Sequence, residues 1–173
     1  MKGSRNAVTA LIALFLALSG IGFAPHASAH GARTPASKPT KPSAAAEEKA
    51  FGREGDPTRI DRTIEIGMSD AMRFDPARID VKQGETIRFV VKNPGVLMHE
   101  MVLGTMVDLR SHSELMKKHP DMEHDEPYQA HVQSGTEGVM VWQFTQPGEF
   151  YYACLIPGHF EAGMFGKIVV AEK

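Results

Sequence analysis

One stretch decides how this chain is interpreted: Cys154-Leu-Ile-Pro-Gly-His159-Phe-Glu-Ala-Gly-Met164. It begins with the only cysteine among the 173 residues and continues to a histidine and a methionine at regular spacing. A thiolate, an imidazole and a thioether in one short segment form a compact set of soft donors. A type 1 copper ion is bound by one Cys, two His and a weak axial Met. The stretch therefore predicts three of the four ligands of a copper site.

The missing histidine is expected upstream, at His99. The turn Asn93-Pro-Gly precedes it, and a short alternating run begins at it. A turn followed by a strand can present an imidazole to a distant loop. The predicted ligands are His99, Cys154, His159 and Met164. Alternatively, the cysteine is a buried free thiol, or the site holds zinc, although structural zinc usually needs more thiolates or a C-x2-C pair, which the chain lacks.

The ligand stretch resembles that of cupredoxins, the plastocyanin-, azurin- and auracyanin-like blue copper proteins. The shared features are Pro157-Gly158-His159 followed by Gly163-Met164, and the resemblance spans about residues 59–173. It implies a Greek-key β-sandwich in which the loop Cys, His and Met and the strand His bind the copper. In that family the strand His is often followed by Asn, whereas this chain has Glu100.

The resemblance also implies an apolar docking patch around the loop histidine. Pro157, Phe160, Met98 and Val96 are its expected members. An alternative for Phe160 is a core position beneath the loop.

Strand patterns support an all-β sandwich over 59–173, a single cupredoxin-like domain. Short alternating or apolar runs are separated by Gly, Pro and Asn, as in sandwich domains. The expected strands are 59–66, 78–82, 86–92, 99–103, 139–144, 149–154 and 167–171.

One short helical insertion is expected at 107–119. His112, Met116 and His119 would share one face of it, since they are spaced i, i+4 and i+7. Two interpretations stay open: a solvated helix with Leu115 facing the core, or a second, labile copper site.

The N-terminus has the pattern of a cleavable signal peptide at 1–29. Two basic residues precede the apolar run 7–23, and the small-residue site Ala27-Ser-Ala follows. The run is short for a membrane anchor, so we expect export to a bacterial periplasm with no membrane span in the mature form. A flexible, disordered linker is expected at 30–58. His30 would then be the first residue, and its amine and imidazole could chelate a second copper ion.

Composition narrows the choice of partners. The chain has 19 Lys and Arg against 21 Asp and Glu, and loss of the signal peptide removes two basic residues, so the formal charge falls from −2 to −4. This balance argues against a nucleic-acid partner. The expected partner is a periplasmic redox or copper-handling protein, and a monomer is expected.

Three functions fit a copper site in such a chain. The first is single-electron transfer through Cu(I)/Cu(II). The second is copper tolerance, favoured by ten Met and eight His in the chain and by their clustering in 98–131. The third, a copper enzyme, is disfavoured because the sequence has no H-x-H pair for further copper centres.

Overall fold

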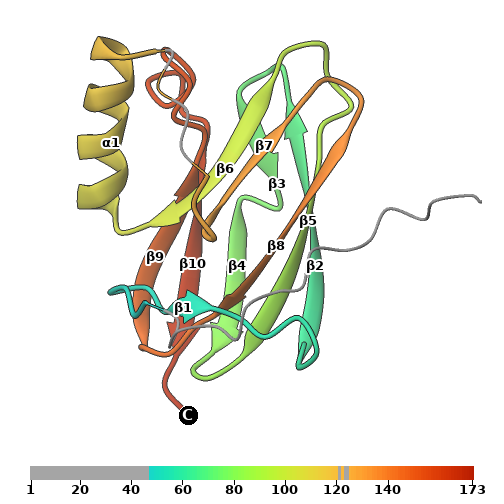
Figure 1. The fold of residues 1–173 in the computed structure, drawn as a ribbon, viewed down its shortest axis with the longest axis vertical. Helices are drawn as coiled ribbons and strands as arrows, with labels where there is room; N and C mark the ends of the chain where they lie inside the picture. Colours follow the sequence, from blue (N-terminus) through green and yellow to red (C-terminus); the bar gives the residue numbers. More distant parts are fainter. Residues whose placement is uncertain (1–46, 121, 123–124) are drawn as a thin grey trace, which may run out of the picture. The chain divides into compact units, whose positions relative to one another are not determined.

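The computed structural model describes residues 47–120, 122 and 125–173. This part of the chain contains two five-stranded β-sheets (Figure 1). The first sheet has the order β1 (Arg53–Glu54), β8 (Glu137–Gln143), β5 (Thr86–Lys92), β2 (Arg62–Ser69) and β3 (Arg73–Asp75). The second has the order β4 (Arg78–Lys82), β10 (Phe165–Ala171), β9 (Gly148–Ala153), β6 (His99–Gly104) and β7 (Gln129–Val132). The predicted signal peptide, His30 and the linker up to residue 46 lie outside the described residues.

Both sheets are mixed, since β2 pairs with β5 and β4 with β10 in parallel while the other pairs are antiparallel. The predicted β-sandwich with one short helix is confirmed. Strands β1, β3 and β7 were not predicted, because segments of two to four residues are too short for alternation to be visible.

The core lies between the sheets and follows the period of two in the strands. In β5, Ile87, Phe89 and Val91 are buried, and Met140 and Trp142 of the neighbouring β8 join them. Alternate side chains of a strand point to opposite faces, so each strand gives every second residue to the core. This rigid core fixes the loops at the ends of the strands.

Helix α1 (Met106–Lys118) follows β6 and packs on the second sheet. Thr105 caps its N-terminus by accepting a hydrogen bond from the N–H of Asp108. The buried helix residues are Leu109, Ser113 and Met116. The prediction that Leu115 faces the core is wrong, because its side chain lies off this face and is 43% exposed.

Residues 47–58 belong to the domain, so the predicted linker 30–58 is too long at its C-terminal end. The Phe51 ring stacks on Trp142, whose indole N–H donates to the Phe51 carbonyl at 2.8 Å. Strand β1 extends the first sheet beyond β8. One aromatic anchor and a few backbone hydrogen bonds hold a segment whose composition is otherwise that of a tether.

We expect Phe51→Ala to lower the free energy of unfolding by about 3 kcal/mol, the usual cost of removing a buried aromatic ring. Urea denaturation measures this effect. Leu115→Ala is the control, with a change below about 1 kcal/mol because that side chain is partly exposed. Equal, small effects in the two variants would show that residues 47–58 add nothing to stability.

No helix in residues 47–120, 122 and 125–173 has the length and apolar character needed to cross a membrane.

Candidate metal centre

Three predicted ligands meet at one end of the second sheet. Antiparallel pairing of β6 with β9, with Val102 opposite Ala153, brings the start of β6 beside the end of β9. His99 is the first residue of β6, and Cys154 directly follows β9. The loop from Cys154 to Met164, here called the ligand loop, then turns back into β10 and carries His159 into the same place.

The donor atoms of these residues converge. The Nδ1 atoms of His99 and His159 are 3.3 Å apart, and Cys154 Sγ lies 3.2 Å from His159 Nδ1. Among the described residues, this is the only group of three or more His, Cys, Asp or Glu side chains whose ligand atoms all lie within 4.8 Å of one another. Donors placed about 2.0 to 2.3 Å from one metal ion are about 3 to 4 Å apart. The observed separations therefore fit a single ion between the three side chains.

Burial sets the protonation of the donors. Cys154 is fully buried, and desolvation raises the pKa of its thiol to about 12. The backbone N–H groups of Glu100 and Ile156 act in the opposite direction on this pKa, with a smaller effect. Desolvation and the nearby His99 lower the pKa of His159. At neutral pH the protein without metal holds a protonated thiol and a neutral imidazole, so a metal must displace the thiol proton.

Met164 is held next to the other two loop residues by its backbone. Its N–H donates to the His159 carbonyl at 3.0 Å, and its carbonyl accepts from the Cys154 N–H at 3.1 Å. The side chain is fully buried. The thioether is thus enclosed at the same end of the sandwich as the three converging donors.

Two glycines allow the ligand loop its tight path. Gly158 has φ +91° and Gly163 has φ +93°, in the region that side chains with a Cβ rarely adopt. From the first sheet, the Arg73 guanidinium donates to the Ala162 carbonyl at 2.9 Å. This contact ties the loop to a strand that the sequence pattern did not predict.

Asp70 is a functional residue that the sequence interpretation missed. Its Oδ1 lies 3.2 Å from His99 Nε2. Since a carboxylate only accepts, Nε2 donates its proton to Asp70, and Nδ1 is the ring nitrogen on the side of Cys154 and His159. The Val96 and Leu97 N–H groups donate to the same carboxyl and, with His99, lower its pKa. No local motif marks Asp70, because it comes from a turn far from His99 in sequence.

Glu100, which stands where many cupredoxins have Asn, connects β6 to the ligand loop. Its carboxyl is buried, and Oε1 accepts a hydrogen bond from the Leu155 N–H at 2.9 Å. Oε2 lies 3.1 Å from His131 Nδ1 of β7. The longer carboxyl side chain thus fixes the residue after Cys154 through its backbone.

The residues predicted for a second site line three different cavities. His112 lines a cavity with Phe51 and Tyr128, Met116 is buried, and His119 is exposed beside Pro120.

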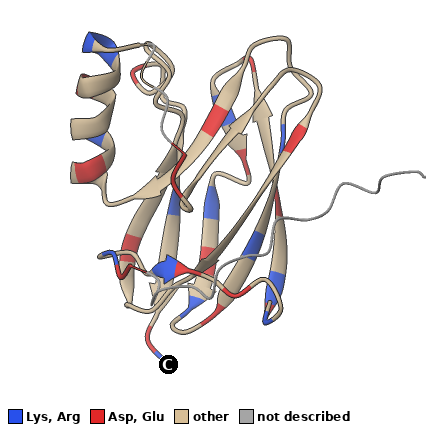
Figure 2. Ribbon diagram, in the orientation of Figure 1, with Lys and Arg blue, Asp and Glu red and all other residues tan. Residues whose placement is uncertain are grey.

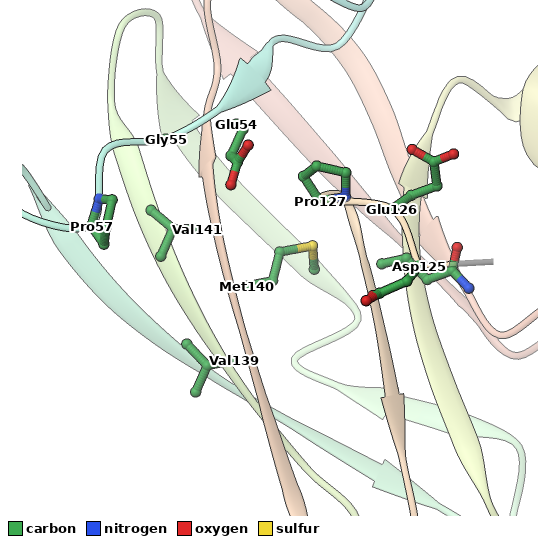
Figure 3. A pocket seen from close by; sticks show the side chains of 10 residues that line it. Glu54, Gly55, Pro57, Asp125, Glu126, Pro127, Val139, Met140 and Val141 are labelled. Carbon is green, nitrogen blue, oxygen red and sulfur yellow. The ribbon is translucent and has the colours of Figure 1, made fainter. Parts of the chain in front are cut away.

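A separate cavity of about 400 Å³ lies beside β1 and β8 (Figure 3). Glu54, Asp125 and Glu126 are among its lining residues. Their carboxylates do not form a converging group of the kind seen at His99, Cys154 and His159 within the described residues. Within the described residues, the converging group of His, Cys, Asp or Glu side chains is therefore the one at the ligand loop.

Comparison with known proteins agrees with this geometry. Residues 61–171 match the family of copper binding proteins, plastocyanin/azurin family. The chain belongs to this family, the cupredoxins, and its cofactor is copper.

Within the family the chain falls in the copper-resistance group. It is 54% identical over 120 residues to the copper-resistant cuproprotein CopI of Rubrivivax gelatinosus, covering 69% of this chain and 73% of that protein. A protein of the same name from Pseudomonas aeruginosa is 33% identical over 157 residues, covering 72% and 84%.

Solved structures show the same fold. Auracyanin B superposes with a TM-score of 0.58 at 21% identity, covering 73% of this chain and 98% of that one. The reduced auracyanin of Roseiflexus castenholzii has a TM-score of 0.56 at 22% identity, covering 63% and 96%.

Proposed function

We propose that this protein is a periplasmic copper-tolerance protein that binds one copper ion as a type 1 centre. The observation that carries the proposal is its 54% identity to a protein named for copper resistance. The converging His99, Cys154 and His159 donors support the ligand assignment, in which Met164 would be the fourth ligand. The signal peptide expected at 1–29 supports the location.

The residues of the chain define how such a centre works. Copper supplies one-electron chemistry when bound, because thiolate and thioether suit Cu(I) and imidazole suits Cu(II). Cys154 gives up its proton on loading and becomes a buried thiolate. Asp70 and Glu100 hold the strand histidine and the ligand loop in place, and such supporting contacts fix ligand orientation.

Electron transfer to a partner protein is a second candidate function, favoured by the surface next to the site. The loops 93–98 and 133–136 contain no Asp, Glu, Lys or Arg, and Figure 2 shows them in tan at the end of the strands. Val96 is 80% exposed and Leu97 and Met98 about half as much, whereas Phe160 is partly buried against the cluster under α1. A small apolar rim suits the weak docking of a redox partner. We propose a monomer that meets such a partner, or a copper-handling protein, here, and no catalytic step on an organic substrate.

Growth in copper tests the tolerance proposal. The full-length chain, with its own signal peptide, is expressed in a copper-sensitive bacterium that lacks its own copper-tolerance cupredoxin. We expect wild type to raise the copper concentration that halves growth, and Cys154→Ala to return it to the value of the empty vector at equal protein level in periplasmic extracts. Equal protection by wild type and Cys154→Ala would contradict a role for the ligand loop. No protection by wild type, with normal copper loading, would favour the electron carrier.

Asp70→Asn should weaken Cu(II) binding about tenfold, at the lower end of the usual effect of removing a partner of a ligating histidine. The amide oxygen still accepts the His99 N–H, but the negative charge that favours Cu(II) is lost. If Cu(I) binding is unchanged, the reduction potential rises by about 60 mV, the one-electron equivalent of that factor. Redox titration measures the shift.

Asp80→Asn on β4 is the matched control, because Asp80 pairs with Arg78 and has no contact with the site. A potential that moves equally in both variants would contradict a specific role of Asp70.

A further inference from the structure

Another cavity, of about 570 Å³, opens beside the ligand loop and has a wall rich in thioether sulfur. Met98, Met116 and Met122 line it. They come from three separate segments: the loop before β6, helix α1, and the segment that follows the helix. Ile156 and Pro157 of the ligand loop line the same cavity, so it adjoins the type 1 site.

Packing alone does not explain these methionines. Met116 is buried under the helix, but Met98 is 40% exposed and Met122 is only partly buried. The Met98 sulfur accepts a hydrogen bond from the Gln133 amide at 3.1 Å, and Gln133 also lines the cavity. The sulfur of an exposed methionine is therefore positioned at the cavity wall instead of being free in solvent.

The other polar groups of the wall favour a cation. The carboxyl groups of Glu100 and Asp125 line the cavity, and so does the imidazole of His131. His131 Nδ1 faces Glu100, and its Nε2 lies 2.5 Å from the Gln129 amide nitrogen. No Lys or Arg is among the lining residues. Negative charge in a partly enclosed cavity attracts a positive ion.

We propose that this cavity is a second copper site that binds a cuprous ion through Met98, Met116 and Met122. Thioethers are soft ligands that select Cu(I) over Zn(II), Mg(II) or Ca(II). This inference rests on the proposed function, because a copper-tolerance protein gains from binding more than one copper ion. It differs from the predicted His112, Met116 and His119 set, of which only Met116 lines this cavity.

The test is an anaerobic titration of the mature chain with its methionine methyl groups labelled with ¹³C. One equivalent of Cu(I) first fills the type 1 site, and a second is offered as its bicinchoninate complex. We expect the chelator to lose about one further equivalent, and the methyl signals of Met98, Met116 and Met122 to shift in this second step only. Signals of core methionines such as Met68 and Met140 should stay in place.

Variants separate this site from others. Met98→Leu combined with Met122→Leu keeps side-chain volume, so the fold should be retained. It should weaken binding of the second ion about tenfold or more, because two of three soft ligands are lost. Met106→Leu, also on α1 but in none of the cavities described, is the matched control and should leave both steps unchanged.

Binding of a single equivalent by wild type would overturn the inference, and so would a second step that survives the double substitution. Neither result would contradict the assignment of the type 1 site. Failure of the proposed function is detected separately, by the growth assay with Cys154→Ala, so the two failures are distinguishable.

Discussion

Cys154→Ala should abolish the intense visible band of the copper-loaded protein. That band is charge transfer from a cysteine thiolate to Cu(II), and Cys154 is the only cysteine of the chain. The small EPR splitting of type 1 copper should disappear with it. Visible absorption and EPR of wild type and variant, loaded with equal copper, measure this result. An unchanged band in the variant would contradict the assignment of Cys154 as a ligand.

Proton release during copper loading is a second measurement that tests Cys154 as a copper ligand. Burial holds the pKa of the Cys154 thiol near 12 in the protein without copper, so the thiol is protonated at about pH 8, while the lowered pKa of His159 leaves that ring neutral. Loading wild type in weak buffer at that pH should release about one proton more than loading Cys154→Ala. The apparent copper affinity of wild type should therefore rise with pH over this range, and that of the variant should not. Equal proton release by both would mean that the metal does not displace the thiol proton.

Glu100→Ala should lower the free energy of unfolding by about 2 to 4 kcal/mol, from lost packing and from a buried Leu155 N–H left without an acceptor. It should also speed the loss of copper, since the residue after Cys154 is no longer anchored to β6. Denaturation in urea and the rate of copper transfer to a chelator measure the two effects.

Glu100→Gln separates the anchor from simple packing. Its amide oxygen still accepts the Leu155 N–H, so we expect a cost below about 1.5 kcal/mol and a copper loss rate near that of wild type. Glu137→Ala on β8 is the exposed control and should change stability by less than about 0.5 kcal/mol. Equal effects of Glu100→Ala and Glu100→Gln on copper loss would contradict the anchoring role.

Particular segments show how far the sequence predicts the fold. The strands 78–82 and 86–92 were predicted at their observed bounds, because buried residues alternate with less buried ones along 78–82 and from Ile87 onward in 86–92. Helix α1 was predicted within one residue at each end. The attachment of residues 47–58 was missed, since one phenylalanine gives no periodic signal and its stacking on Trp142 depends on distant residues.

The ligand candidates could be named from sequence because each is a rare residue type at a fixed spacing in one short loop, with His99 set apart by the turn before it. The contacts that support these ligands could not be predicted from the sequence. Asp70 reaches His99, and Arg73 reaches the ligand loop, only because the last residues of β2 and the first residues of β3 and β6 lie at the same end of the sandwich. The i, i+4 and i+7 spacing of His112, Met116 and His119 shows the limit of sequence spacing, because these residues line three different cavities.

The sequence by itself determined the class of fold, the copper-binding family and the residues of the ligand loop, because alternation and donor spacing are local properties of the chain. The tertiary structure alone decided that Asp70 orients the strand histidine, that Glu100 anchors the loop and that Met98 and Met116 share a cavity. These contacts join residues far apart in the chain, and their geometry exists only after two sheets and a helix have packed together.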